Sequence, residues 1–195
     1  FPLDPASVRR SLSLNPDDRV ILFLAESTSN YRKGFGLLRE ALPNLATIDN
    51  LVLLSVGSSR PEVPETVRHI HLGRLSSTRL LNLAYNAADL FVIPSRQDNL
   101  PNTVLESLAC GTPVVGFDAG GIPDMVRPGE TGLLAEVENV RSLSEAITHI
   151  LTHDAKRSAM IARCRDVAVS EYALHVQAER YMDLFNDLQQ RSSTS

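Results

Sequence analysis

The chain has 195 residues, a hydrophobic fraction of 43% and a formal net charge of −4. This length and apolar content suit a single α/β domain with a sizeable core. The acidic balance argues against non-specific nucleic-acid binding, which relies on basic patches. The longest apolar runs, VILFLA and LVLLSV, are far shorter than the roughly 18–20 residues that cross a bilayer. The two cysteines are isolated, so we expect a reducing compartment and a packed core thiol at Cys110.

Apolar runs and helical patterns alternate along the chain. The runs that predict strands are residues 20–25, 51–56, 70–72, 89–93 and 113–117, with 132–135 as a sixth candidate. The patterns that predict helices are residues 35–45, 77–88, 103–110, 140–152, 155–170 and 174–190. Continuous apolar runs are typical of strands covered on both faces. The alternation therefore predicts an α/β fold, a Rossmann-like doubly wound parallel sheet of about six strands with helices at its C-terminal end.

We predict one Rossmann-like domain over residues 1–195. It has a linker segment over 1–18, a closing helix over 174–190 and a polar, frayed tail over 191–195. The sequence opens on Phe1 without a Met, so we expect the domain to belong to a longer protein.

Residues 94–126, PSRQDNLPNTVLESLACGTPVVGFDAGGIPDMV, hold the densest motif. Asp98 and Glu106 stand eight positions apart, in a loop and near the start of a short helix. Ligands of open α/β sheets bind outside the carboxyl ends of the strands, where this loop must lie. Carboxylates there can accept hydrogen bonds from sugar hydroxyls, while the helix start favours negative charge. The segment indicates a site for a phosphorylated, hydroxyl-rich ligand.

Each residue of this segment also has a structural interpretation. Thr103 and Glu106 fit the capping-box pattern T-x-x-E, in which the Glu caps its own helix. Asp98 alone would be a turn-former. Gly120 and Gly121 form either a tight turn or a place where backbone amides reach a phosphate. Taken singly these alternatives stay open, and only the joint order of the residues favours a ligand site.

A second motif, Arg32-Lys33-Gly34, precedes the first helix after the polar loop ESTSNY. Two cations at a helix N-terminus oppose the helix dipole, which prefers anions there. The arrangement becomes favourable if a phosphate lies between the cations and the helix amides, and Gly34 lets the backbone come close. The motif predicts phosphate binding, with two solvated loop charges as the alternative.

Other chemistries lack a motif. His149 and His153 share a helix face, but no third ligand is placed and H-E-x-x-H is absent, so we predict no metal site. Asp17-Asp18 is predicted to be a solvated turn. A hydrolase nucleophile elbow and a G-x-G-x-x-G dinucleotide motif are both missing from the sequence.

The segment at residues 94–126 resembles the donor-site signature of retaining glycosyltransferases with the GT-B fold, the glycogen-synthase-like and lipopolysaccharide-type group. Those enzymes carry E-x(7)-E, a small-residue helix, G-x-P-V-V and a GG turn. Arg32-Lys33-Gly34 resembles their phosphate motif, and HLGRL at 71–75 their segment around the nucleotide base. Residues 174–190 look like their closing helix, which returns to the partner domain. The resemblance covers about residues 18–188.

The resemblance implies the C-terminal, donor-binding half of such an enzyme. Lys33 and Arg32 would hold the diphosphate of a nucleotide-diphosphate sugar, Asp98 would orient sugar hydroxyls and Glu106 the ribose hydroxyls. The further residues expected to bind the substrate are Asn99, Leu100, Pro101, Asn102, Thr103, Gly73, Arg74, Leu75, Gly120 and Gly121.

Two departures from the family pattern affect this interpretation. Asp98 replaces the usual Glu, which shortens its reach by one methylene, and QDNLPN replaces the common E-G-F-G loop. The family usually carries an Arg at the end of the first strand, where Thr28 stands here. We expect Arg32 to act as the second phosphate cation instead.

The resemblance implies a retaining hexosyltransferase of polysaccharide or glycolipid biosynthesis, without a cofactor, metal or nucleic acid. The acceptor would lie on a separate N-terminal domain, so the domain alone is expected to be inactive. We expect a cytoplasmic location, with contact to the inner membrane face only through the full-length protein. Two alternatives stay open: a non-catalytic nucleotide-sugar or phosphate-binding module, and half of a sugar-nucleotide epimerase.

Overall fold

The structure, a computed structural model, describes residues 1–192. One parallel sheet has the order β3-β2-β1-β4-β5-β6. Its strands are β1 (Arg19–Leu24), β2 (Leu51–Val56), β3 (Arg68–His71), β4 (Leu90–Ile93), β5 (Val114–Phe117) and β6 (Gly132–Ala135). Strand order reverses between β1 and β4, as in doubly wound Rossmann-like folds. The predicted fold class is confirmed, including the sixth strand.

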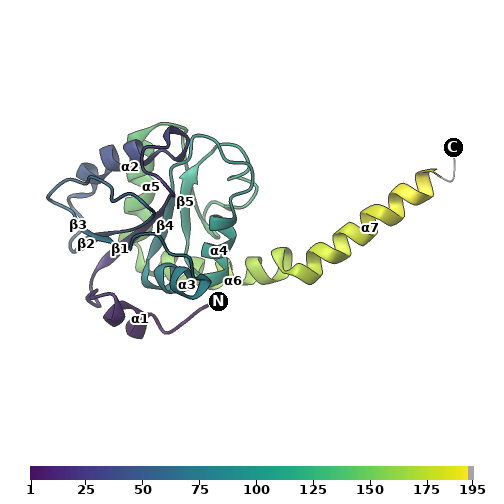
Figure 1. Cartoon of the computed structure of the whole chain (residues 1–195), viewed down its shortest axis with the longest axis horizontal. Helices are drawn as coiled ribbons and strands as arrows, with labels where there is room; N and C mark the ends of the chain where they lie inside the picture. The colour runs from purple at the N-terminus through teal and green to yellow at the C-terminus, as the bar shows by residue number, and fades with distance from the viewer. Residues whose placement is uncertain (193–195) are drawn as a thin grey trace.

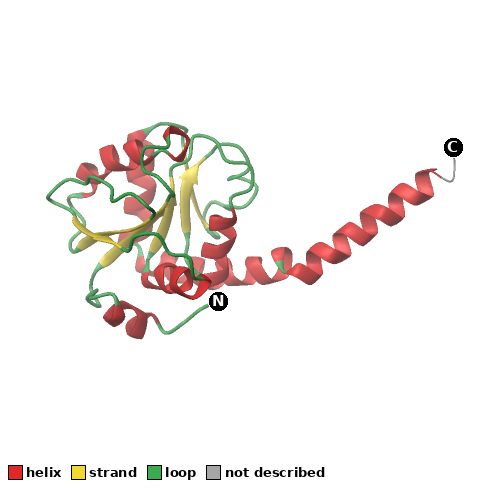
Figure 2. Cartoon of the chain, in the orientation of Figure 1, coloured by secondary structure: helices red, strands yellow, loops and turns green. Residues whose placement is uncertain are grey.

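Helices cover both faces of this sheet (Figure 2). The α-helices among the described residues are α1 (Pro5–Ser11), α2 (Phe35–Ala41), α3 (Thr78–Ala87), α4 (Asn102–Cys110), α5 (Val140–Thr152), α6 (Asp154–Tyr172) and α7 (Leu174–Ser192), the last of which projects away from the sheet (Figure 1). The 3-10 turns lie at Tyr31–Lys33 and Leu42–Leu45. The helix predicted over 35–45 changes to a 3-10 turn at Leu42. Pro43 explains the change, because proline lacks the N–H of an α-helical hydrogen bond.

The core lies in two layers, one on each face of the sheet. In β1, Ile21 and Phe23 pack with the layer under α2 and α5, whereas Val20 and Leu22 pack with the layer under α3 and α4. Successive strand residues point to opposite faces. Both sets are buried, which explains why the strands read as continuous apolar runs.

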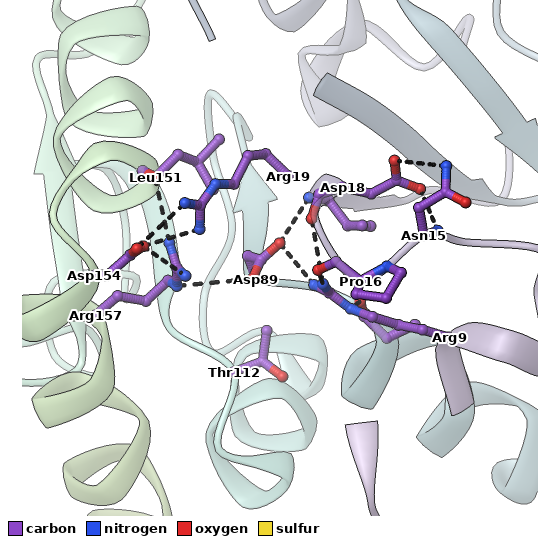
Figure 3. A network of polar contacts seen from close by, with 12 residues as sticks. Arg9, Asn15, Pro16, Asp18, Arg19, Asp89, Thr112, Leu151, Asp154 and Arg157 are labelled. Atoms are coloured by element: carbon purple, nitrogen blue, oxygen red, sulfur yellow. Dashed lines mark hydrogen bonds and ion pairs between the residues drawn. The ribbon is translucent and has the colours of Figure 1, made fainter. Parts of the chain in front are cut away.

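The predicted linker over residues 1–18 contains α1 and is packed on the domain. Asp4 caps this helix by accepting from the Ser7 amide. Arg9 donates to Asp89 Oδ2 at 2.7 Å, and Figure 3 shows Asp89 between Arg9 and Arg157. This network lies where β1 and β4 begin, at the edge of the sheet opposite their carboxyl ends.

The predicted solvated turn at Asp17-Asp18 is wrong for Asp18. Its side chain is only 3% exposed and forms an ion pair with Arg68 at 2.8 Å. It also accepts from the Asn15 amide at 2.7 Å. Burial of a carboxylate is tolerated here because a cation and a backbone N–H compensate its charge.

The last helix, α7, leaves the body of the domain (Figure 1). It carries large apolar side chains that are more than half exposed, namely Leu174, Tyr181, Met182, Leu184 and Phe185. Residues 174, 181 and 185 follow helical spacing, so they form one stripe. The predicted closing helix over 174–190 is confirmed as a helix. Arg191 and Ser192 of the predicted tail belong to α7, and 193–195 lie outside the described residues. Within residues 1–192, no helix combines the length and the apolarity that a bilayer crossing requires.

Candidate functional site

The loops that follow β1 and β4 meet at the carboxyl ends of these adjacent strands. The Arg96 amide donates to the Arg32 carbonyl at 2.9 Å. Gly34 has a φ of +68°, and a Cβ on it would lie 1.8 Å from the Pro94 carbonyl oxygen. Only glycine fits this position, because it combines a left-handed backbone with a close approach to another chain segment. The two predicted motifs are therefore neighbours at the point where strand order reverses.

The predicted phosphate cations and the predicted sugar-orienting carboxylate are in contact. Lys33 Nζ lies 2.7 Å from Asp98 Oδ2, and Arg32 Nη1 lies 3.5 Å from the same oxygen. The Asp98 side chain is 13% exposed, against 25% for Lys33 and 49% for Arg32. Arg32 Nη1 also donates to the Gln97 carbonyl at 3.1 Å. The cluster holds two cations around one carboxylate, so it keeps a surplus positive charge for an anionic ligand.

The glycine turn after β5 supports the Asp98 loop. The Gly121 amide donates to the Asp98 carbonyl at 2.8 Å. A Cβ on Gly120 would lie 2.1 Å from the Asp98 carbonyl oxygen, and one on Gly121 would lie 1.5 Å from the Asn99 carbonyl oxygen. Side chains at both positions would collide with backbone, which explains the glycine pair. Because the Gly121 amide already donates to the Asp98 carbonyl, contacts of Gly120 and Gly121 with a ligand stay a prediction.

The start of α4 lies next to Asp98 in the chain and lacks a side-chain cap. Pro101 is the N-cap residue, and no side chain accepts from the first amides of the helix. Leu100, just before it, is 65% exposed. Uncapped amides and the helix dipole favour a negatively charged or electron-rich ligand group. Asn99, Leu100, Pro101, Asn102 and Thr103 occupy this loop and first turn, and their contacts with a substrate stay a prediction.

Glu106 does not cap α4. The helix begins at Asn102, so Glu106 lies in its second turn and Thr103 is already helical. Instead, the Tyr85 hydroxyl donates to Glu106 Oε2 at 2.9 Å. The capping alternative is therefore wrong. Among residues 1–192, no hydrogen bond or ion pair joins Glu106 to the Lys33–Asp98 pair.

The predicted base segment follows β3 at the same edge of the sheet. Gly73 has a φ of +69°, and its carbonyl accepts from the Gly57 amide at 3.0 Å. Arg74 Nη1 lies 3.6 Å from Oε1 of Glu26, a residue of the loop after β1, and both side chains are highly exposed. Leu75 packs against the core layer under α3 and α4. Glu26 thus offers the base segment a carboxylate that faces solvent.

Two site residues escaped the sequence interpretation because only the fold brings their partners together. Tyr85 is a buried residue of α3, and nothing in its local pattern points to Glu106. Arg96 stacks over the Tyr31 ring at 3.8 Å and donates to Glu138 Oε1 at 2.5 Å. Arg96 Nη1 also donates to the Tyr31 carbonyl at 2.6 Å. Arg96 thereby fastens the Arg32-Lys33 loop to the Asp98 loop.

Groups able to bind a metal do not assemble. Among residues 1–192, no three or more His, Cys, Asp or Glu residues gather in a way that could hold a metal ion. The rings of His149 and His153 stack 4.4 Å apart. His153 Nδ1 donates to the His149 carbonyl at 2.8 Å, which takes one ring nitrogen from any ligand set. Cys110 is buried, as predicted.

Solved structures place this fold in a known class. Sucrose-phosphate synthase from Thermosynechococcus elongatus superposes with a TM-score of 0.81 at 26% identity, over 98% of this chain and 50% of that chain. Anabaena HepE, solved in complex with UDP and glucose, gives 0.79 at 18% identity over 96% and 54%. The C-terminal domain of the group 1 protein LpcC from Francisella tularensis gives 0.76 at 16% identity over 89% and 96%. The chain has the fold of one half of a GT-B glycosyltransferase.

Sequence comparison agrees with this class. The chain belongs to the family glycosyl transferases group 1, which matches residues 18–153. A GDP-mannose-dependent monoacylated alpha-(1-6)-phosphatidylinositol monomannoside mannosyltransferase of Corynebacterium glutamicum is 32% identical, over 94% of this chain and 51% of its own length. A GDP-mannose-dependent alpha-mannosyltransferase of Mycolicibacterium smegmatis is 35% identical, over 71% and 39%. The chain therefore spans about half the length of such relatives.

Proposed function

We propose that this chain is the donor-binding half of a retaining glycosyltransferase that uses a nucleotide-diphosphate sugar. The observation that carries the proposal is the Lys33–Asp98–Arg32 cluster beside the uncapped start of α4. Cations for a diphosphate and a carboxylate for sugar hydroxyls occur together at the strand-order reversal, where ligands of doubly wound sheets bind.

The chemistry follows from how charge develops during transfer. Breaking the sugar–phosphate bond places negative charge on the leaving diphosphate and positive character on the anomeric carbon. Lys33 and Arg32 stabilise the leaving group, because preorganised cations compensate charge at little reorganisation cost. A bound diphosphate replaces Asp98 as the negative partner of Lys33 and Arg32. Asp98 then accepts hydrogen bonds from the sugar. Glu106 accepts from the ribose hydroxyls, and no metal is needed.

The acceptor lies on another part of the protein in this proposal. The chain spans about half the length of its relatives, and the apolar stripe of α7 is exposed. A contiguous exposed apolar surface of this kind is typical of an interaction site. We propose that the N-terminal, acceptor-binding domain of the parent protein packs against that stripe. Retention of configuration, a role in polysaccharide or glycolipid synthesis and a cytoplasmic location rest on the family resemblance and stay predictions.

A non-catalytic nucleotide-binding module is the second candidate. Thr28 stands where the family usually has an arginine, and its amide donates to the Ser59 hydroxyl at 3.0 Å. Thr28 therefore ties the loop after β1 to Ser59 and supplies no cation. Together with Asp98 in place of Glu, this favours binding without turnover. The epimerase alternative lacks such an observation, and both sequence relatives named above are described as mannosyltransferases.

Calorimetry with UDP, GDP and ADP, followed by transfer assays with the matching sugar nucleotides, tests the proposal. We expect this chain to bind one nucleoside diphosphate with a Kd of roughly 10 μM to 1 mM, because one wall of the site is present. It should transfer no sugar alone, and its full-length parent should. Binding without turnover in the parent would favour the module. Robust transfer by the 195-residue chain itself would contradict the half-enzyme assignment.

A further inference from the structure

Tyr85 joins α3 to the carboxylate of Glu106 on α4. Its hydroxyl donates to Glu106 Oε2 at 2.9 Å. The Tyr85 side chain is rigidly held, because the residue is only 1% exposed and its ring packs edge-on against Phe91 with centroids 5.7 Å apart. The Tyr85 carbonyl also accepts from Thr112 Oγ1 at 2.8 Å. The donor atom is thus fixed from both its ring and its backbone.

The contact engages only one oxygen of Glu106. Glu106 itself is exposed, and within residues 1–192 its Oε1 has no hydrogen-bond partner. Burial, reinforced by the charge of Glu106, raises the pKa of Tyr85 well above its ordinary value. The phenol therefore keeps its proton and stays a donor at every working pH. One carboxylate oxygen is held in place and the other is available.

Space for a ligand opens beside this carboxylate. A cavity of about 560 Å³ lies along α3 and α4 and reaches the first residues of the chain, and its mostly apolar lining includes Phe1, Leu3, Thr78, Asn82, Tyr85 and Glu106. If the Tyr85–Glu106 hydrogen bond served only to join α3 to α4, the Glu106 carboxylate would not need to face solvent at the wall of a cavity. A carboxylate oxygen accepts strongly from hydroxyl groups, and two neighbouring hydroxyls of a ribose suit it.

We propose that Tyr85 is a positioning residue of the nucleotide site, which holds Glu106 so that its second oxygen accepts from the ribose hydroxyls. This inference rests on the proposed function. Tyr85 itself does not touch the ligand. Its contribution depends on orientation, since a carboxylate that rotates freely must be ordered when the ligand binds.

The test compares Tyr85→Phe, Glu106→Gln and the double variant. The probe is UDP or GDP, whichever the wild type binds more tightly, together with its 2′,3′-dideoxy counterpart. We expect Tyr85→Phe to weaken ribonucleotide binding about three- to tenfold and Glu106→Gln about tenfold or more. The double variant should be no weaker than Glu106→Gln, because Tyr85 acts through Glu106. Neither single variant should change the affinity for the dideoxy nucleotide.

A matched control is Tyr172→Phe, which removes a phenol that donates to the Asp124 carbonyl at 3.2 Å. It should leave both affinities unchanged, and thermal melting should show all variants folded. Equal weakening of both nucleotides by Tyr85→Phe would reveal a general structural effect and overturn the inference. So would unchanged ribonucleotide affinity in Tyr85→Phe or in Glu106→Gln. A wild type that binds no nucleoside diphosphate would instead refute the proposed function.

Discussion

Lys33 and Asp98 are 65 positions apart in sequence and form a 2.7 Å ion pair where β1 and β4 end. The cation assigned to the diphosphate is thus already compensated by the carboxylate assigned to the sugar. A bound diphosphate competes with Asp98 for Lys33, so the two residues should affect nucleotide binding in opposite directions.

Replacement of Lys33 by alanine should weaken binding of the nucleoside diphosphate. We expect a loss of about 1.5–3 kcal/mol, or roughly ten- to a hundredfold, as for a charge-assisted hydrogen bond. Calorimetry at low salt measures it, and wild-type binding should also weaken as salt rises. Lys156→Ala is the control, because Lys156 lies on α6 beside His149, away from the site. Equal affinity of Lys33→Ala and wild type would show that Arg32 and Lys33 are surface charges without a role in binding.

Replacement of Asp98 by asparagine should act differently on two ligands. Without the carboxylate, Lys33 and Arg32 lose an internal competitor, so affinity for the free diphosphate should rise about two- to tenfold. Affinity for the sugar nucleotide should fall relative to the free diphosphate, because the proposed sugar contact is weakened. The ratio of the two dissociation constants is the measured quantity. A ratio equal to that of the wild type would remove Asp98 from the sugar subsite.

Two glycines near α2 should respond oppositely to alanine. Gly34→Ala places a Cβ 1.8 Å from the Pro94 carbonyl oxygen at a φ of +68°, so we expect a loss of at least about 2 kcal/mol of stability. Gly36→Ala meets no atom within 4 Å and lies inside the helix, so it should stabilise by about 0.5–1 kcal/mol. Urea unfolding measures both. A Gly34→Ala variant as stable as wild type would contradict the described approach of the two loops.

Stability should depend on the protonation of His69. Burial, with repulsion from Arg60 and His71, lowers the pKa of His69 below its ordinary value. The folded state then binds this proton less tightly than the unfolded state, so stability falls as pH drops below about 6.5. The stability advantage of wild type over His69→Gln should therefore be larger at about pH 7.5 than at about pH 5. Melting temperatures at the two pH values measure it, and a constant difference would contradict the prediction.

The sequence was sufficient for elements whose signal is local. The strands at 51–56 and 132–135 and the helix at 140–152 have the predicted bounds, because apolar run length and helical spacing express burial directly. The joint order of Asp98, Glu106 and Gly120-Gly121 also located the carboxyl-end loop, since loop position in a parallel sheet follows from topology.

Only the tertiary structure decided which partner each polar group finds. Taken alone, the T-x-x-E pattern at Thr103 favoured a cap, but α4 begins earlier and Glu106 pairs with Tyr85 from another helix. Asp18, predicted to be solvated, is buried because Arg68 from β3 reaches it. Hydrogen bonds and ion pairs act over a few ångströms in space, whereas periodicity reports only which face of an element is buried. The sequence by itself therefore determined the sheet, its helices and the edge that carries the motifs. The tertiary structure decided that Lys33 pairs with Asp98 and that Tyr85 pairs with Glu106.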